Sequence, residues 1–564
     1  MFQHIRNHEL RIVLGVAFLF LIYALIHSAY GLPLHLIGDE ESLLSGALKM
    51  LQQRTIPVLE PQEFSALYYP IGLPALYAIG TLSYAAFVFV FARGVDTAAQ
   101  LSDYLLVHLE YPWLIARALS AFAGAALIVV TYRVARAIFT DQARSALYAS
   151  LFVATSFLNF QLSVVARHWV FSALLLMLGL YYIVRNEKTD RCSLRRAGFL
   201  AGLSVGVSQI GVVTILLVAC AYAVWNRTGL KPLLSNRSLR EYAFISLPLA
   251  AFFFLLHPGA FSFIAAGEET PVAAAKDILF VLRELKMTIW YLLQHEFVIT
   301  LLAVAGFFAL SIARKARIAA ILLLPIVLYN LFLVAVYHNA PRYHLYMIPL
   351  LSIAAGYALS LLAHGSARLD RRIGFGIAVV VFAVPLASAL RYGYLLKTPP
   401  TESLASAWIR ERAETGAAFV LNAPMLSFIH DDASAEFQSR VGRVPLVSRS
   451  LAGTDIGVFG GQKVRYVNVH FWDSESTRAS LKEFIAGYRP SYAVISYDTE
   501  AAIEADHNRF LRSQGRLSAA FDNRAAGSPG IPVPVQPFDE YGFLNARLFS
   551  IQRFGSYVAA YQLN

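Results

Sequence analysis

The stretch Gly38-Asp39-Glu40-Glu41, followed directly by residues 42–53, decides how the chain is interpreted. Residues 42–53 have the spacing of an amphipathic helix, and the first long hydrophobic run ends shortly before them. Carboxylates beside a membrane lose solvation and persist there when a cation or a reacting group meets them. A structural role fits as well, with Asp39 as the helix cap and Glu40 and Glu41 opposite the helix dipole.

The composition predicts a polytopic membrane protein. The 564 residues are 57% hydrophobic and 15% charged, which is too apolar for a soluble protein. There are 47 basic and 36 acidic residues, a net charge of +11, but Lys and Arg cluster in short loops between hydrophobic runs. This pattern indicates membrane orientation and no nucleic-acid partner. Cys192 and Cys220 have no metal or redox spacing, so we expect free thiols.

Hydropathy predicts about eleven membrane spans. The first is retained, because a basic N-terminus precedes the apolar run Ile12 to Ala29 and no small-residue cleavage pattern follows it. The expected spans are 12–30, 113–138, 145–165, 169–185, 197–208, 210–225, 242–257, 297–313, 318–337, 344–363 and 373–394.

The stretch 69–91 determines the topology. If it crossed the membrane, every later loop would change sides, and basic loops such as the one with Arg133 and Arg136 would lie outside. We therefore expect a juxtamembrane or re-entrant helix, broken by Pro70 and Pro74, in the first external loop.

The same topology makes Ala197 to Trp225 two short helices, because both flanks are then cytoplasmic. Two such helices are short for a bilayer of about 30 Å, so we expect the turn between them, near Gln209, to be buried in protein. The external side then collects loop 31–111, the turns near Arg167 and Gln209, loop 258–296, the turn His338–Tyr343 and everything after about Leu395.

The composition changes after Lys397, where charged and polar residues become more frequent. Residues 418–421, 466–469 and 492–496 have the pattern of short strands, with helical segments at 402–414 and 480–487 between them. We expect a transmembrane module over 1–394 and a soluble, external α/β domain over 395–564, with a loop at 527–534. The sequence has no Walker loop and no zinc spacing in this domain.

The first external loop resembles the membrane glycosyltransferases of the GT-C fold. Within that class the chain is most similar to the superfamily of protein O-mannosyltransferases and aminoarabinose-lipid A transferases. The resemblance covers roughly residues 1–394 and rests on the order of short motifs more than on any single one. The motifs are Gly38-Asp39-Glu40-Glu41, Tyr68-Tyr69-Pro70-Ile71-Gly72-Leu73-Pro74, Arg117-Ala118-Leu119-Ser120-Ala121-Phe122-Ala123-Gly124, Ala135-Arg136-Ala137-Ile138-Phe139, 197–206 and Pro341-Arg342-Tyr343-His344-Leu345-Tyr346.

The resemblance implies an inverting glycosyltransferase that uses a polyprenyl-phosphate-linked sugar as donor. The acceptor hydroxyl of a glycan, lipid or protein attacks the anomeric carbon on the external face, and a carboxylate takes its proton. We assign that base to Asp39, because apolar surroundings raise a carboxyl pKa toward working pH. Glu40 is the second candidate, as an orienting or acceptor-binding carboxylate, and Glu41 is expected to serve the helix dipole.

The leaving phosphate needs cations or hydrogen-bond donors. We expect these from Arg167, His168, Arg342 and Gln209, with His338 and His344 as further external groups. Arg342 could instead be an interfacial side chain that reaches toward water, and each histidine could only bond backbone. Aromatic faces suit sugars and membrane interfaces alike, so Tyr68, Tyr69 and Trp169 are expected contacts of the sugar or headgroup.

Two positions depart from the family pattern. The second external turn reads Ala166-Arg167-His168-Trp169 where related enzymes often carry an Asp, which argues against a metal held between loop carboxylates, and we assign no metal or cofactor. Gln209 stands where a Lys often contacts donor phosphate, and it supplies no charge. A secondary transporter and a non-catalytic relative that binds lipid-linked sugar remain alternatives. The expected location is a bacterial inner membrane, with the site facing the periplasm.

Overall fold

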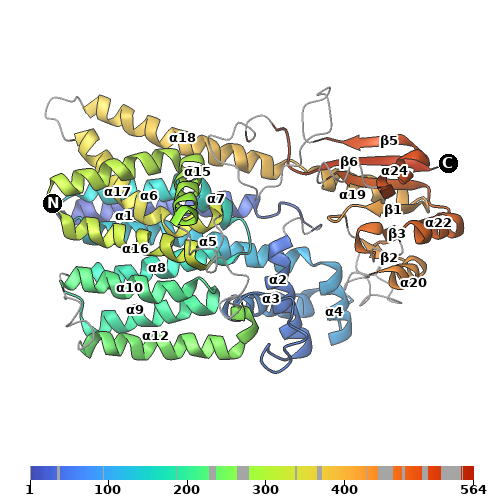
Figure 1. The fold of residues 1–564 in the computed structure, drawn as a ribbon, viewed down its shortest axis with the longest axis horizontal. Coiled ribbons are helices and arrows are strands. Elements are labelled where there is room, and N and C mark those ends of the chain that lie inside the picture. The colour runs from blue at the N-terminus through green and yellow to red at the C-terminus, as the bar shows by residue number, and fades with distance from the viewer. Residues whose placement is uncertain are drawn as a thin grey trace.

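The computed structural model describes residues 2–563 apart from 33, 35–37, 93, 187, 228–236, 263–277, 337–339, 365–370, 427, 443–460, 473–476, 498–505, 523–547 and 549–550. Two parts follow one another along the longest axis of the molecule: a bundle of helices that holds the N-terminus and a sheet domain that holds the C-terminus (Figure 1). The helices of the bundle are α1 Phe2–His27, α2 Gly38–Gln53, α3 Gly72–Phe91, α4 Ala98–Val107, α5 Glu110–Ile138, α6 Ala143–Thr155, α7 Phe157–Ser163, α8 His168–Val184, α9 Arg191–Val207, α10 Gly211–Asn226, α12 Arg237–Leu256, η1 Pro258–Phe261, α15 Ile278–Ile312, α16 Ala316–Val336, η2 Pro341–Tyr346, α17 Ile348–His364 and α18 Arg371–Lys397.

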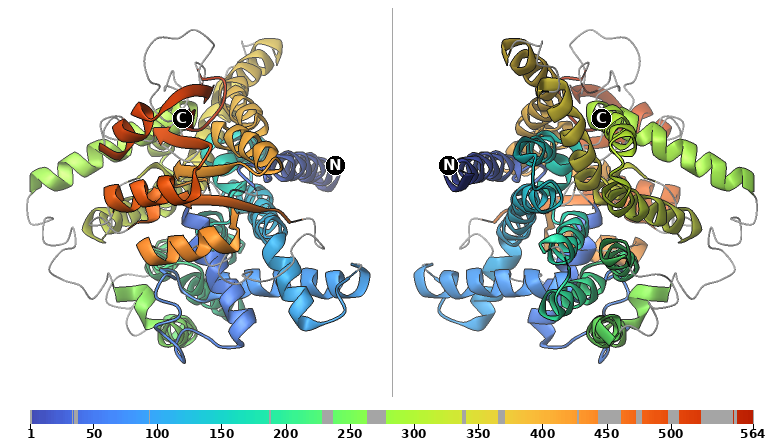
Figure 2. Two further views of the ribbon diagram at one scale, coloured as in Figure 1. Left: turned by 90° about the vertical axis from the view of Figure 1, so that its right-hand side faces the viewer. Right: turned by 90° about the vertical axis from the view of Figure 1, so that its left-hand side faces the viewer.

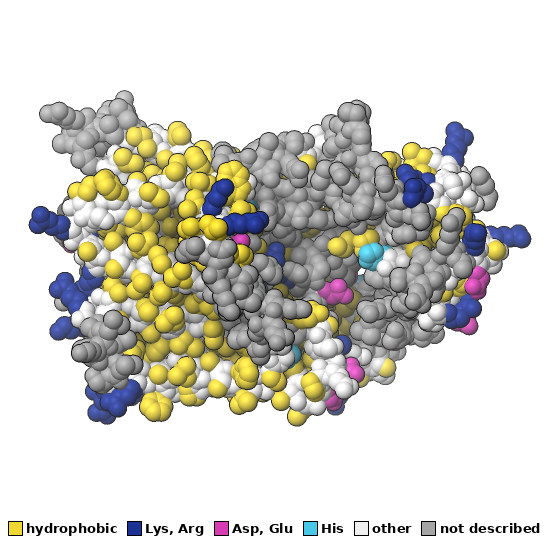
Figure 3. Space-filling view, in the orientation of Figure 1, with side chains coloured by type: hydrophobic (Ala, Val, Ile, Leu, Met, Phe, Trp, Pro, Cys, Tyr) yellow, Lys and Arg dark blue, Asp and Glu magenta, His cyan; other side chains and the backbone are white. Residues whose placement is uncertain are grey.

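The bundle is that of a polytopic membrane protein. Among the described residues, seven helices are long and apolar enough to cross a membrane, or eight if α6 and α7, bent by 53° at Ser156, form one span. A band of hydrophobic side chains covers the bundle, and Lys and Arg gather at the end that holds the N-terminus (Figure 3). The prediction of about eleven spans is confirmed in part. Four of the predicted spans, α8, α9, α10 and α17, are helices of only 16 or 17 residues and are not among the seven or eight.

Two apolar helices leave the direction of the bundle. Helix α3 passes the same test of length and composition as the spans, yet it extends sideways from the bundle when the molecule is viewed along its long axis (Figure 2). Its N-terminus packs closely on the end of α9, since a Cβ atom on Gly72 would lie 2.5 Å from the carbonyl oxygen of Gly206. Helix α15 changes direction at Glu296, whose φ of −133° and ψ of 46° are not helical. The predicted span from residue 297 begins at this break.

The predicted hairpin is present as α9 and α10. Ser208, Gln209 and Ile210 join the two helices and are each no more than 5% exposed, as expected for a turn buried in protein. The hydroxyl of Ser204 donates to the carbonyl oxygen of Gly211 at 2.9 Å and closes this turn. The apex therefore satisfies its polar groups inside the bundle.

The C-terminal part is a mixed six-stranded sheet in the order β2-β3-β1-β4-β6-β5. Strands β2, β3, β1 and β4 are parallel, and β6 and β5 add antiparallel pairs at one edge. The predicted strands correspond to β1, β3 and β4, while β2, β5 and β6 were not predicted. The elements are α19 Thr401–Ala413, β1 Ala418–Asn422, β2 Ile429–His430, α20 Asp432–Val441, β3 Lys463–Asn468, η4 Val469–Phe471, α22 Thr477–Tyr488, β4 Tyr492–Tyr497, α24 Asp506–Ser513, β5 Gly515–Phe521 and β6 Tyr557–Leu563. The predicted loop 527–534 lies outside the described residues.

Alternating side chains of the sheet enter two separate cores. In β1, Phe419 and Leu421 belong to the core that contains Ile409 of α19, whereas Val420 belongs to the core that contains Phe437 of α20 and Phe484 of α22. This alternation follows from the period of two along a strand. The helices therefore cover both faces of the sheet.

The chain returns from the sheet domain to the bundle before β6. Leu548, Ile551 and Phe554 are each no more than 5% exposed and share one core with the membrane helices. Arg391 of α18 donates to the carbonyl oxygens of Leu548 at 3.2 Å and Ile551 at 2.5 Å. The ring of Phe554 lies 5.8 Å from that of Tyr30, just beyond the end of α1. The sheet domain is thereby anchored on the end of the bundle where the acidic loop lies.

Candidate active site

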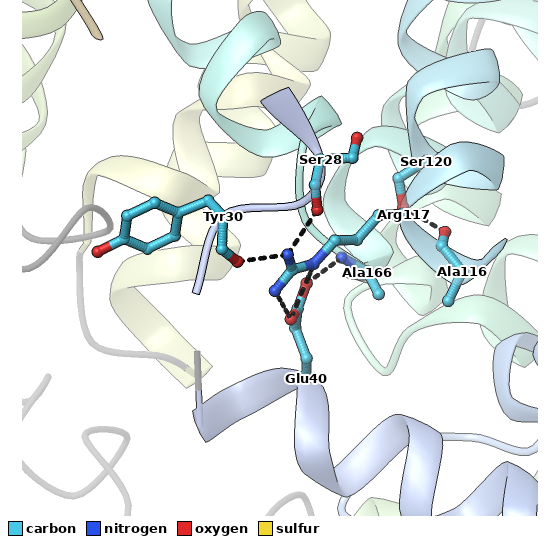
Figure 4. A network of polar contacts seen from close by, with 7 residues as sticks. All are labelled: Ser28, Tyr30, Glu40, Ala116, Arg117, Ser120 and Ala166. Carbon is cyan, nitrogen blue, oxygen red and sulfur yellow. Dashed lines mark hydrogen bonds and ion pairs between the residues drawn. The ribbon is translucent and has the colours of Figure 1, made fainter. Parts of the chain in front are cut away.

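A buried ion pair holds the acidic loop in place. Glu40, in the first turn of α2, and Arg117 of α5 are both completely buried, and the Arg117 Nη2 to Glu40 Oε2 distance is 2.6 Å (Figure 4). The Nε atom of Arg117 also donates to both carboxylate oxygens, at 3.0 and 3.2 Å. The contact is thus a two-pronged guanidinium–carboxylate pair, which fixes both distance and orientation.

The same two side chains bind three further segments. Nη1 of Arg117 donates to the carbonyl oxygens of Ser28 at 2.6 Å and Tyr30 at 2.7 Å, where α1 ends. The backbone amide of Ala166, in the turn before α8, donates to Glu40 Oε1 at 2.5 Å (Figure 4). One buried pair therefore fixes α1, α2, α5 and the turn before α8 relative to one another.

The three adjacent carboxylates have different positions. Glu40 points into the protein, whereas Glu41 is exposed, and its role at the helix dipole stays a prediction. Asp39 is the residue before Glu40 in α2, but its side chain lies outside the described part of the structure, so its role as base stays a prediction.

Five predicted site residues meet at the N-terminus of α8. The Arg167 guanidinium carbon lies 4.3 Å from the centroid of the Trp169 ring and 5.4 Å from that of Tyr69. The His168 ring lies 5.1 Å from Tyr69, and Arg342 of η2 lies 5.7 Å from Trp169. We call this group, Tyr69, Arg167, His168, Trp169 and Arg342, the cation cluster. Arg167, His168 and Trp169 are at most 4% exposed.

The cation cluster favours an anion. Burial and the charge of Arg342 both lower the pKa of Arg167, because both disfavour its charged form. The positive end of the α8 dipole adds to the same field, since Arg167 stands in extended conformation directly before the helix. A phosphate between the two guanidiniums would relieve their repulsion and accept hydrogen bonds from both.

The other predicted site residues lie around this cluster. The Gln209 side-chain amide donates to the backbone oxygen of Tyr68, which joins the hairpin apex to the loop before α3. The Tyr68 ring is 67% exposed. His338 lies outside the described residues. His344 is completely buried on the other side of η2, with its ring 5.9 Å from Tyr291 of α15.

Sequence reasoning missed two features of this region. Arg117 stands out in the sequence only as part of a motif, and no hydropathy pattern reveals its pairing with a residue 77 positions away. His295 and Glu296 were placed at the end of an external loop, yet both are only 2% exposed at the break in α15. A carboxylate inside a long apolar run is the signal that could have identified Glu296. In the described part of the chain, no three His, Cys, Asp or Glu side chains are grouped to hold a metal ion.

Comparisons with known proteins give distant structural matches. No protein-family model matches the chain, and no curated protein matches it significantly. ArnT from Cupriavidus metallidurans bound to undecaprenyl phosphate is 16% identical, with 97% of this chain and 98% of that one covered and a TM-score of 0.44. An apo oligosaccharyltransferase from Archaeoglobus fulgidus is 12% identical, with 86% and 70% covered and a TM-score of 0.40.

The arabinofuranosyltransferase AftD from Mycobacteria is 16% identical, with 98% of this chain and 40% of that one covered and a TM-score of 0.41. The last two proteins are glycosyltransferases by name. Identities of 12–16% and TM-scores below 0.5 are too low to transfer residues or roles to this chain.

Proposed function

We propose that the chain is an inverting glycosyltransferase that moves a hexosyl or pentosyl group from a polyprenyl-phosphate carrier to an acceptor hydroxyl at the external face of the membrane. The acceptor oxygen attacks the anomeric carbon, and the bond from that carbon to the phosphate oxygen breaks. Polyprenyl phosphate leaves with the electron pair, and Asp39 takes the proton of the hydroxyl. The acceptor is a glycan, lipid or protein hydroxyl.

One contact carries this proposal. The Ala166 amide that donates to Glu40 immediately precedes Arg167 in the chain, so the first turn of α2 is bonded to the turn that bears the cations. A base on α2 and a phosphate on the cation cluster would then act on a single substrate. In this arrangement Glu40 is a positioning residue, because its oxygens are engaged by Arg117 and by the amide.

The remaining residues have roles around the leaving group. We assign the phosphate oxygens to Arg167 and Arg342, whose planar forks match them, with His168 as a further donor. Tyr69 and Trp169 are proposed contacts of the sugar or the phosphate headgroup. Tyr68 and Gln209 hold the loop before α3 against the hairpin apex, at the rim of the site.

The charge distribution supports the orientation. The helices α9 and α12 begin at the end of the bundle opposite to the sheet domain (Figure 1), where Lys and Arg gather (Figure 3). The exposed Arg195 and Arg237 belong to the starts of these two helices. By the positive-inside rule that end is cytoplasmic, which leaves the acidic loop and the sheet domain outside. We propose a transmembrane catalytic module over 1–394 and an external domain over 395–564, in a bacterial inner membrane.

The test is sugar transfer by the purified chain in lipid, with a panel of undecaprenyl-phosphate-linked sugars as donors. Asp39→Asn keeps the size of the side chain and removes the base, so turnover is expected to fall by about 10²–10⁴-fold while donor binding is retained. Glu41→Gln is the matched control: it removes a carboxylate two positions along the same helix, and turnover is expected to stay near that of the wild type.

The other outcomes separate the alternatives. Equal turnover in the wild type and in Asp39→Asn would move the base elsewhere and overturn the role of Asp39. Donor binding by the wild type without turnover of any sugar would support a non-catalytic relative. Sugar movement across the membrane without transfer would support a transporter.

A further inference from the structure

A second polar group lies inside the protein on the far side of η2 from Arg342. It consists of His295 and Glu296, at the break in α15, and His344 of η2. All three are at most 2% exposed, and none has a part in the cation cluster as described. The N-terminus of α7 completes the junction, because α15, α7 and η2 contact one another there.

One oxygen of Glu296 is fixed and the other is not. Oε1 accepts from the Ser156 hydroxyl at 2.6 Å and from the Leu158 amide at 2.8 Å, so the carboxylate caps α7. Oε2 is buried and has no hydrogen-bond partner among the described residues. The capping bonds hold the carboxylate rigidly, while its second oxygen is available to a ligand.

The two imidazoles present further open positions. Nδ1 of His295 lies 2.9 Å from the carbonyl oxygen of Tyr291, but its Nε2 has no partner in the described part of the chain. Neither ring nitrogen of His344 has a partner there, and both histidines contact Tyr291, His344 with its ring 5.9 Å from the Tyr291 ring and His295 through the Tyr291 carbonyl oxygen. Four buried polar atoms at one junction are thus left open, and buried polar groups without partners are rare in folded proteins.

We infer that this junction, Glu296, His295 and His344, binds the hydroxyl groups of the donor sugar. The inference rests on the proposed function, in which the phosphate occupies the cation cluster. Arg342 and His344 are two residues apart on η2, a rise of about 4 Å along a 3₁₀ helix, and they face Trp169 and Tyr291 respectively. A phosphate bound beside Arg342, together with the sugar bonded to that phosphate, is long enough to reach from Arg342 to His344.

The chemistry of the open atoms fits a hydroxylated ligand. A carboxylate oxygen accepts a hydrogen bond, and an imidazole ring can both donate and accept. A sugar hydroxyl both donates and accepts, so several hydroxyl groups satisfy all four atoms at once. The polyprenyl chain has no polar group to offer, which makes the junction a site that distinguishes a loaded carrier from an empty one.

Two probes isolate the sugar from the carrier: undecaprenyl phosphate and undecaprenyl-phosphate-linked sugar, each titrated against the full chain in lipid nanodiscs. For Glu296→Gln and for His344→Gln, Kd for the sugar-linked probe is expected to rise about tenfold, as for the loss of one or two buried hydrogen bonds. Kd for the bare carrier should not change, and this result also shows that the variants are folded. Arg342→Gln, which acts on the phosphate, should weaken both probes.

The proposal is overturned if both junction variants weaken the two probes equally, or if neither probe responds to either variant. Should His344→Gln fail to fold, His295→Gln tests the same ring pair from α15. If the wild type binds the bare carrier and the sugar-linked one with equal affinity, the junction does not recognise sugar. If the wild type binds neither probe, it is the proposed function itself that fails.

Discussion

Glu40 and Glu296 are both buried glutamates near the start of a helix, but their partners differ. Glu40 meets a guanidinium and a backbone amide, and its charge is compensated by Arg117. Glu296 meets the Ser156 hydroxyl and the Leu158 amide through Oε1, and its Oε2 has no partner in the part of the chain that the structure describes. A fully paired carboxylate fixes the backbone around it and has nothing left for a substrate. A carboxylate with one bonded oxygen is also held in place, and its second oxygen can still accept a hydrogen bond from a ligand.

The comparison also separates two kinds of cost. A buried ion pair contributes little net stability, because desolvation offsets the attraction, but removing one partner leaves an uncompensated charge. A carboxylate whose hydrogen-bond donors are neutral leaves no unpaired charge behind when a neutral side chain replaces it. The loss of unfolding free energy is then smaller. Substitutions at Glu40 and its partners should therefore change mainly the stability of the protein. Substitutions at Glu296 and its partners should change mainly ligand affinity.

The largest effect is expected from Glu40→Gln. The substitution leaves the Arg117 guanidinium buried opposite a neutral amide, which should cost about 3–5 kcal/mol of unfolding free energy. Thermal and denaturant unfolding of the protein in detergent measures this loss. The matched control is the double variant Glu40→Gln with Arg117→Met, which removes both charges and should recover part of the stability. A single variant as stable as the wild type would contradict the structural role of the pair.

Phe554→Ala should have a smaller effect. It tests whether the C-terminal sheet domain supports the segments that Glu40 and Arg117 hold together. Phe554 is completely buried, and its ring lies 5.8 Å from Tyr30, whose carbonyl oxygen accepts from Arg117. Truncation leaves a cavity that should cost about 3 kcal/mol and loosen the segment after α1. Faster hydrogen exchange at residues 28–32, together with lower turnover, is the expected result. Phe554→Leu keeps most of the side-chain volume and should restore both the slow exchange and the turnover. Unchanged hydrogen exchange in Phe554→Ala would show that the sheet domain contacts the bundle without stabilising the segment after α1.

The sequence predicts the elements of the molecule better than their contacts. Apolar runs and basic loops locate the membrane helices. The predicted break at Pro70 and Pro74 does not set α3 apart from them by length or composition, because Pro74 lies inside α3 and the helix is as long and apolar as a span. The predicted span 297–313 begins at the break in α15, but the predicted loop 258–296 is wrong over residues 278–295, which form the first part of α15. These features are local, so each follows from a few neighbouring residues.

The site depends on contacts that no local pattern contains. Glu40 reaches partners 77 and 126 positions away, and Glu296 reaches one 140 positions away. Asp39, Glu40 and Glu41 look equivalent as three adjacent carboxylates, and only the packing of α2 on α5 shows that Glu40 is buried and Glu41 exposed. The sequence alone is enough to identify the acidic loop and the arginines as candidate site residues. The fold is needed to show that they have different roles.

The smallest effect is expected from Ser156→Ala, which sharpens the comparison at Glu296. Ser156 accepts from the Asn159 amide at 3.1 Å as the cap of α7 and donates to Glu296 at 2.6 Å. Losing an N-cap hydroxyl costs about 1 kcal/mol, so the unfolding midpoint should fall slightly. Because Glu296 then loses one of the bonds that orient it, affinity for the sugar-linked probe should weaken while that for the bare carrier is kept. Ser163→Ala, at the other end of the same short helix, is the matched control. If the two variants behaved alike with both probes, the cap of α7 would be structural only, and Glu296 would bind its ligand without help from Ser156.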